Sequence, residues 1–241
     1  MNILSIGNSF STDAQRYLHQ IASADGFQLN CFNLFIGGCS LSHHYRNMLS
    51  GERAYELEMN GESTGFRVSL GEALLSRDWD IVTLQQVSNE APCYDTYQPY
   101  LDSIAGYVRK CVPKARLAIQ QTWAYEENSC RLNTELGYTH HQEMFRDIEN
   151  AYSEAAKAIN ADFIIPSGAL FQKLIQDGIG KVHRDTFHAG LGLGRYALGL
   201  LWYAVITGRS VKGNTFCGLD EAAAPEHIEI AKKCVDELIL K

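Results

Sequence analysis

A serine near the N-terminus of this 241-residue sequence lies where a nucleophile of acyl transfer is expected. Ser9 is part of the segment GNSFS at 7–11, between a short apolar run at 3–6 and the start of helical periodicity. A serine in such a strand-to-helix turn is close to the free N–H groups of the helix start, which can stabilise an oxyanion. The alternative is a structural role, because Ser9, Ser11 or Thr12 would also serve as the N-cap of that helix.

The base that a serine hydroxyl needs is expected near the C-terminus, beside a carboxylate that orients it. In the segment RDTFHAG at 184–190, Asp185 precedes His188 by three residues, a spacing that one turn of loop or 3₁₀-helix folds into contact. We expect His188 to take the proton from Ser9 and to return it to the leaving alcohol, while Asp185 holds the imidazole tautomer. The alternative is that Asp185 and His188 only shape a loop.

Five other histidines are weaker candidates for the base, namely His43, His44, His140, His141 and His183. The neighbours at 43–44 and at 140–141 point apart in a helix or a strand, and therefore make poor two-ligand metal sites. The seven cysteines include no CxxC pair and no Cys/His zinc spacing, and the first strand is not followed by a Gly-Lys-Ser/Thr motif. The sequence predicts no catalytic metal and no cofactor.

These residues need a scaffold that brings the two ends of the chain together. Short apolar runs without strict alternation are typical of parallel strands buried on both faces, and they lie at 3–6, 29–36, 81–84, 117–119 and 163–165. Segments of helical period separate or follow them, at 13–25, 66–77, 98–111, 140–159, 168–177, 192–207 and 221–238. This alternation predicts one α/β domain over 1–241, a three-layer α/β/α sandwich around a five-stranded, mostly parallel sheet. Residues 39–65 are the least regular and are expected to form a substrate lid or a plain surface connection.

Ligands of such sheets bind beyond the carboxyl ends of the strands, which the sequence places at 7–11, 37–44, 85–90, 121–125 and 166–168. An oxyanion hole at that edge needs two or three hydrogen-bond donors. The backbone N–H of Ser9 is one candidate donor because of its position in the strand-to-helix turn. The backbone N–H of Gly38, in the glycine pair after the second strand, is another. A glycine pair after a strand also serves a turn alone.

The first and last of these motifs resemble those of the SGNH, or GDSL-like, hydrolases. Gly7-Asn8-Ser9 matches their first motif, with Asn8 in place of the usual Asp, and Asp185-x-x-His188 matches their C-terminal Asp-x-x-His. Members of this superfamily are esterases, lipases and carbohydrate deacetylases. The resemblance implies a flavodoxin-like fold and a serine esterase with the triad Ser9, His188 and Asp185. It also aligns Gly38 with the glycine donor of the second motif.

The third motif departs from the superfamily pattern of Gly-x-Asn-Asp. After the third apolar run the sequence has QQVSNE at 85–90, which resembles the Gln-Gly-Glu of the sialate acetylesterase-like branch. We assign the side-chain donor of the oxyanion hole to Gln86, with Ser88 and Asn89 as alternatives. A further alternative is that Gln85 and Gln86 only satisfy backbone groups of the loop.

The amino-acid composition restricts the classes of binding partner and the location of the protein. A net charge of −7 and a pI near 5.6, without a cluster of Lys and Arg, disfavour nucleic acid and anionic membranes. No apolar stretch is long enough for a membrane-spanning helix. The scattered cysteines are expected to be mostly reduced and buried. With no leader pattern at the N-terminus, the sequence predicts a cytoplasmic protein, or an exported one if a leader precedes it, and leaves the oligomeric state open.

Aromatic residues crowd the predicted strand-end loops, namely Tyr94, Tyr97, Trp123, Tyr125, Tyr138 and Phe187. Aromatic faces suit sugar rings, and apolar pockets suit short acyl groups. Together with the resemblance, this predicts hydrolysis of a short acyl ester, such as the acetyl ester of a carbohydrate. A competing interpretation is a catalytically inactive, carbohydrate-binding member of the same fold. A third interpretation is a flavodoxin-like nucleotide-binding or signalling domain. Such a domain needs a phosphate cradle or an acidic cluster, and neither is evident in the sequence.

Overall fold

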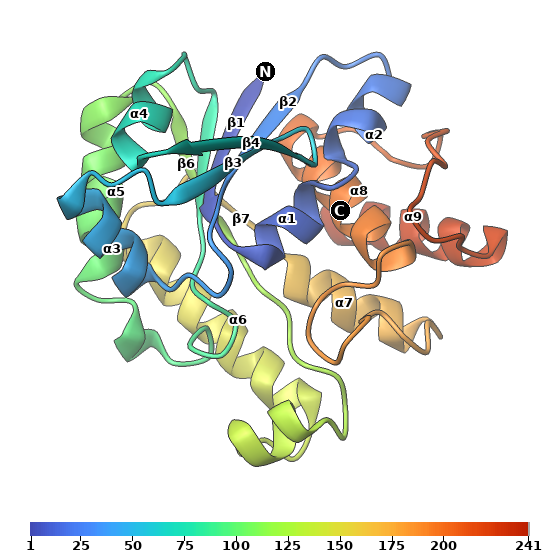
Figure 1. The fold of residues 1–241 in the computed structure, drawn as a ribbon. Helices are drawn as coiled ribbons and strands as arrows, with labels where there is room; N and C mark the ends of the chain where they lie inside the picture. The colour runs from blue at the N-terminus through green and yellow to red at the C-terminus, as the bar shows by residue number, and fades with distance from the viewer. Residues whose placement is uncertain (241) are drawn as a thin grey trace.

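The computed structural model describes residues 1–240 and is built around a seven-stranded sheet with the order β4-β3-β2-β1-β5-β6-β7 (Figure 1). Five strands run parallel, namely β1 (Asn2–Gly7), β2 (Asn30–Phe35), β5 (Ile81–Leu84), β6 (Arg116–Gln120) and β7 (Phe163–Ile165). They occupy the five apolar runs of the sequence, whose side chains are mostly buried because helices cover both faces. The predicted, mostly parallel α/β sheet is confirmed.

Two further strands extend the sheet beyond the five that the sequence predicts. β3 (Tyr55–Met59) pairs antiparallel with β2, and β4 (Glu62–Val68) pairs antiparallel with β3. Asn60 and Gly61 connect them with φ angles of 53° and 84°, the left-handed pair that a tight two-residue hairpin requires. The predicted strand count was therefore wrong, because this hairpin at the edge of the sheet carries polar side chains and contains no apolar run.

Helices form the two outer layers (Figure 1). One layer contains the helices from the two ends of the chain, α1 (Ser9–Gln15), α2 (Leu18–Ala24), α7 (Ser167–Gln176), α8 (Leu193–Thr207) and α9 (Pro225–Ile239). The other layer contains the helices from the middle of the sequence, α3 (Leu41–Ser50), α4 (Leu70–Leu75), α5 (Tyr100–Cys111) and α6 (His141–Ala158). Two short helical turns, η1 (Tyr94–Thr96) and η2 (Arg131–Glu135), lie in the loops after β5 and β6. The observed architecture is the predicted three-layer sandwich.

Every predicted helical segment contains a helix, but some boundaries differ. The segment 13–25 is divided between α1 and α2, and the segment 66–77 begins inside β4. Residues 39–65, expected to be a lid or a plain connection, instead form α3, β3 and part of β4. α3 begins after Ser40, whose hydroxyl accepts a hydrogen bond from the His43 N–H and so caps the helix.

The core is densest around α8, in which every residue from 196 to 204 is buried. This helix is apolar on all sides because it packs against α1, α2, α7 and α9. Among residues 1–240, no helix has both the length and the apolar character needed to span a membrane. All seven cysteines are free thiols, and only Cys31, Cys39 and Cys234 are buried, so the expectation of mostly buried cysteines was wrong.

The parallel register brings the carboxyl ends of β1, β2, β5 and β6 to one edge of the sheet. β1 lies between β2 and β5, and β5 pairs with β6 on its other side. The loop between α7 and α8 reaches the same edge, where Arg184 N–H donates to His188 O and closes a short turn. The two predicted motifs from opposite ends of the chain therefore meet there.

Candidate active site

Ser9 is the first residue of α1, and the turn before it is shaped by its neighbours. A Cβ at Gly7 would lie 2.1 Å from Ser11 Oγ, so glycine is needed between β1 and the helix. Asn8 Oδ1 accepts a hydrogen bond from the Phe10 N–H (3.0 Å), and Ser11 Oγ accepts one from the Asn8 N–H (3.0 Å). The N-cap of α1 is thus Asn8, and the hydroxyl of Ser9 is not used for capping.

The buried Asn8 side chain also joins three loops of the site. Its Nδ2 donates to the Cys39 carbonyl oxygen (3.1 Å), and its Oδ1 accepts a hydrogen bond from Gln85 Nε2 (2.6 Å). An aspartate cannot donate the bond to Cys39, which gives a physical reason for an asparagine at this position. The Ser9 turn, the loop after β2 and the loop after β5 are therefore held in a fixed relation.

Ser9, His188 and Asp185 form a continuous hydrogen-bonded chain. Ser9 Oγ is 2.8 Å from His188 Nε2, and His188 Nδ1 is 2.8 Å from Asp185 Oδ2. Asp185 Oδ1 also accepts a hydrogen bond from the His188 backbone N–H at 2.9 Å. When Asp185 accepts the Nδ1 proton, Nε2 is free to accept the proton of the Ser9 hydroxyl. This is the arrangement that an activated serine requires.

The charge on Asp185 supports this arrangement. Burial raises the pKa of Asp185, but hydrogen bonds from the ring and the backbone N–H of His188 outweigh burial, so that the pKa lies below its ordinary value. The carboxylate is therefore ionised at neutral pH, and it can stabilise a positive charge that develops on the imidazole.

The turn that carries His188 is strained and is held by hydrogen bonds from another loop. Thr186 has a φ of 76°, in the left-handed region that β-branched residues avoid. Glu126 N–H donates to Thr186 O (2.7 Å), and Trp123 Nε1–H donates to Phe187 O (2.8 Å). Both donors follow β6, so the loop after β6 fixes the position of the histidine.

A buried ion cluster centred on Asp13 anchors the same turn to α1. The Asp13 carboxylate is fully buried and accepts a hydrogen bond from the Ala189 N–H at 3.0 Å. It also binds Arg184 Nη1 at 2.9 Å and Arg195 Nε at 2.8 Å. A buried charge is stable only when it is paired and hydrogen-bonded, and here the pairing links the helix of the serine to the loop of the histidine.

A cavity of about 330 Å³ opens beside Ser9 and His188, a volume at the small end of the range for ligand sites. Phe187 forms part of its wall, with its ring centroid 3.9 Å from that of His188. Tyr125 forms another part, and its hydroxyl is 2.9 Å from Ser88 Oγ. The cavity is thus small, and its lining is partly aromatic and partly polar.

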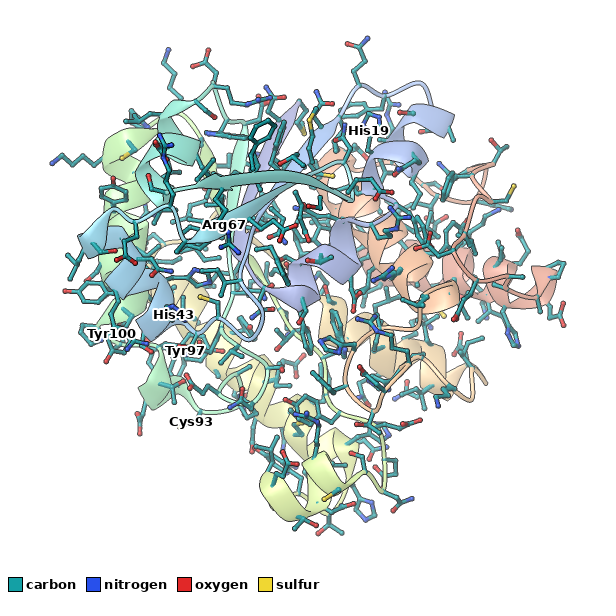
Figure 2. The ribbon with its side chains drawn as sticks, in the orientation of Figure 1. His19, His43, Arg67, Cys93, Tyr97 and Tyr100 are labelled. Atoms are coloured by element: carbon teal, nitrogen blue, oxygen red, sulfur yellow. The ribbon has the colours of Figure 1, made fainter. Side chains whose placement is uncertain are left out.

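The six aromatic residues singled out in the sequence divide into two groups. Tyr125 and Phe187 line the cavity, and Trp123 is buried behind it, with its ring 4.2 Å from that of Phe10. Tyr94, Tyr97 and Tyr138 do not line the cavity. Figure 2 shows Tyr97 together with Cys93 in the segment that leads from β5 to α5.

Two backbone N–H groups are free at the cavity. Ser9 and Gly38 both line it, and neither N–H makes a hydrogen bond within residues 1–240. Gly38 has a φ of 63°, the left-handed conformation that turns the chain between β2 and α3. Because the Cys39 carbonyl oxygen accepts a hydrogen bond from Asn8 Nδ2, this turn is fixed beside the Ser9 turn.

Gln86, the predicted side-chain donor, does not line the cavity, and its polar atoms are engaged elsewhere. Its Oε1 accepts hydrogen bonds from the N–H groups of Leu41 and Val87, at 2.9 Å each, and its Nε2 donates to Thr96 O and Oγ1. The side chain is fully buried and all its polar atoms are engaged. Gln86 therefore satisfies loop groups, which was one of the alternatives from the sequence.

The other two alternatives, Ser88 and Asn89, do line the cavity. Ser88 is buried and its hydroxyl is paired with that of Tyr125. Asn89 is exposed, and its amide makes no hydrogen bond among the described residues. Of the residues in this loop, Asn89 therefore has the free side-chain donor.

None of the five weaker histidine candidates lines the cavity. Burial lowers the pKa of His44 to about 3 and the pKa of His183 to about 4, so both imidazoles are neutral at physiological pH. His43 lies on α3 (Figure 2), while His140 binds the Glu127 carboxylate at the surface. His141 is paired with the side chain of Gln172.

Asp13 and Arg131 belong to the site and were not predicted from the sequence. Asp13 lies on α1 between the buried Phe10 and the buried Ala14, and an acid among buried apolar residues is a signal that a buried partner exists. Arg131 lines the cavity from η2, and no sequence signal marks it because that segment is irregular.

Comparison with known proteins gives the family. A family model described as a domain of unknown function, DUF4886, matches residues 2–236. The crystal structure of a DUF4886 family protein from Bacteroides uniformis is 33% identical, with a TM-score of 0.93 over 100% of this chain and 95% of that chain. A search of the curated proteins finds no match.

Less similar structures share the fold. A predicted SGNH hydrolase from Slackia heliotrinireducens is 20% identical, with a TM-score of 0.62 over 86% of this chain and 98% of that chain. An acetylxylan esterase from Geobacillus stearothermophilus is 15% identical, with a TM-score of 0.52 over 84% of this chain and 90% of that chain. At these identities the likeness shows the fold alone. The chain therefore belongs to the DUF4886 family and has the fold of the SGNH hydrolases.

Proposed function

We propose that the protein is a serine esterase that removes a short acyl group, with acetyl as the preferred group, from an alcohol. The observation that carries the proposal is the chain of two 2.8 Å hydrogen bonds from Ser9 through His188 to Asp185 at the wall of a cavity. A hydroxyl in such a chain is activated for attack on a carbonyl carbon. The acid-base partners and the nucleophile are therefore present in one site.

The reaction follows the usual two steps of acyl transfer. His188 Nε2 takes the proton as Ser9 Oγ attacks the ester carbonyl, and the oxyanion is stabilised by the N–H groups of Ser9 and Gly38 and by the amide of Asn89. His188 then protonates the departing alcohol, leaving an acyl group on Ser9. Water attacks this acyl-enzyme with His188 again as the base, and the acid is released.

The size and walls of the cavity support a small acyl group on a carbohydrate. A volume of about 330 Å³ has to hold both the acyl group and part of the alcohol, which disfavours long acyl chains. The ring of Tyr125 in the cavity wall suits the apolar face of a sugar. An acetylxylan esterase has the same fold, which is consistent with an acetylated sugar as the substrate.

The experiment that tests this function compares p-nitrophenyl acetate with the butyrate and octanoate esters. We expect kcat/KM to be highest for the acetate and to fall by about 10-fold or more at octanoate, because a cavity of this size cannot bury the longer chain. O-acetylated xylo-oligosaccharides are then assayed by release of acetate. A folded protein that hydrolyses none of these esters would contradict the proposal.

Replacing Asn89 by Ala is expected to lower kcat for the acetate by about 10² to 10³-fold, because one oxyanion donor is lost. KM and the melting temperature are expected to change little, since the side chain is exposed and unbonded. The matched control is Gln86→Ala, which leaves two buried N–H groups unpaired and is expected to lower the melting temperature instead. Steady-state kinetics and thermal unfolding of both variants check the assignment, and an unchanged kcat for Asn89→Ala would remove Asn89 from the site.

A further inference from the structure

Arg131 carries a positive charge on the wall of the Ser9 cavity. It is the first residue of η2, and its guanidinium carbon lies 4.1 Å from the centroid of the Phe187 ring. A cation over an aromatic face is attracted by the ring, and Phe187 in turn packs on His188. The stack therefore holds the guanidinium close to the reacting groups.

The hydrogen-bond donors of this guanidinium are free. Within residues 1–240 its side chain makes no hydrogen bond, and its ion pair with Glu135 is 4.0 Å long between two partly exposed side chains. By contrast, Arg16, Arg184 and Arg195 each bind a carboxylate at 2.7 to 2.9 Å. A partly exposed pair at 4.0 Å is worth little, so Arg131 is available to an incoming anion.

The charges around the cavity favour such an anion. Among the described residues that line it, none is an aspartate or glutamate, and Arg131 is the one arginine or lysine. Asp185 is outside the lining, hydrogen-bonded to His188 and 4.0 Å from Arg184 Nε. A protein with a net charge of −7 thus presents a cation at its substrate cavity.

We propose that Arg131 binds a carboxylate on the alcohol part of the ester, so that the substrate is a short acyl ester of an anionic alcohol such as a sugar acid. This proposal rests on the proposed esterase function. In that function the acyl group is short, so the charge is carried by the alcohol part of the ester. The planar guanidinium offers two parallel N–H groups, which match the two oxygens of a carboxylate. Arg131 is then a specificity-determining residue, separate from the groups that perform the chemistry.

The test compares two acetates of nearly equal size, 4-acetoxybenzoate and 4-acetoxybenzamide, whose leaving phenols differ in charge. The readout is the ratio of kcat/KM for the carboxylate to kcat/KM for the amide, which cancels any general loss of activity. We expect Arg131→Gln to lower this ratio by about 10- to 100-fold, mainly through KM for the carboxylate, because a charge-assisted pair is lost. Arg131→Lys, which keeps the charge without the planar fork, is expected to give an intermediate ratio.

The matched control is Lys181→Gln, which removes an exposed positive charge that does not line the cavity and is expected to leave the ratio unchanged. A second measurement needs no variant: added NaCl is expected to raise KM for the carboxylate ester of the unaltered protein and not for the amide. Equal ratios in the unaltered protein and Arg131→Gln, or equal salt dependence of both esters, would overturn the assignment of Arg131. Failure of the folded protein to cleave either acetate would instead overturn the esterase function, and this proposal with it.

Discussion

Replacing Ser9 by Ala is expected to lower kcat for p-nitrophenyl acetate by about 10⁴ to 10⁶-fold while the protein stays folded. The loss is large because the Oγ that is hydrogen-bonded to His188 at 2.8 Å forms the bond to the acyl group in the first step and releases that group in the second. The fold is expected to persist, since the cap of α1 depends on Asn8 and not on the Ser9 hydroxyl. Steady-state kinetics together with circular dichroism and thermal unfolding measure the two effects separately.

A matched control for this variant is Ser153→Ala. Ser153 lies on α6, outside the lining of the cavity, so its loss is expected to leave kcat within a factor of about two. An alanine variant of Ser9 that retains more than a small fraction of the activity would mean that another group is the nucleophile.

Replacing Asp13 by Asn is expected to lower the free energy of unfolding by about 3 kcal/mol, because Arg184 and Arg195 lose a fully buried counter-charge. This loss of stability is at the lower end of the range for a broken buried ion pair. Both arginines are partly exposed, and Arg195 keeps a second partner, Asp220. Activity is expected to fall as well, because the carboxylate holds the Ala189 N–H next to His188. Urea unfolding and esterase assays of the folded variant check both results.

The control for Asp13 is Glu237→Gln, which removes one partner of a surface ion pair with Lys173. A solvent-exposed pair contributes little, so the unfolding curve of this variant is expected to lie close to that of the unaltered protein. Equal unfolding curves for the Asp13 and Glu237 variants would show that the buried cluster does not stabilise the fold.

The parallel part of the fold was predictable because its signal is local. Each of the five parallel strands is a short apolar run, and the run alone locates a strand that is buried on both faces. The hairpin of β3 and β4 lies at the edge of the sheet, and neither of its strands contains an apolar run. Its signals in the sequence were the alternation of polar and apolar residues in β3 and the dipeptide Asn60-Gly61, a typical two-residue hairpin turn.

The candidate site was predictable only in part, for a similar reason. Ser9, Asp185 and His188 lie in short motifs with fixed spacing, and the structure brings these three side chains into contact. The direction of a side chain in an irregular loop depends on its neighbours in space, so the sequence did not distinguish Gln86 from Asn89. Arg131 and Asp13 act through partners from distant elements, and no local pattern reveals such partners.

The measurement that tests the central claim most directly is covalent labelling of the folded protein with a serine-reactive fluorophosphonate, followed by intact mass and peptide mapping. An activated serine attacks this reagent, whereas ordinary serines do not react at neutral pH. We predict one adduct per chain, located on Ser9, which is absent from Ser9→Ala and forms far more slowly on His188→Ala. Absence of an adduct on the folded protein, or an adduct on a different residue, would contradict the assignment of Ser9 and His188 as nucleophile and base.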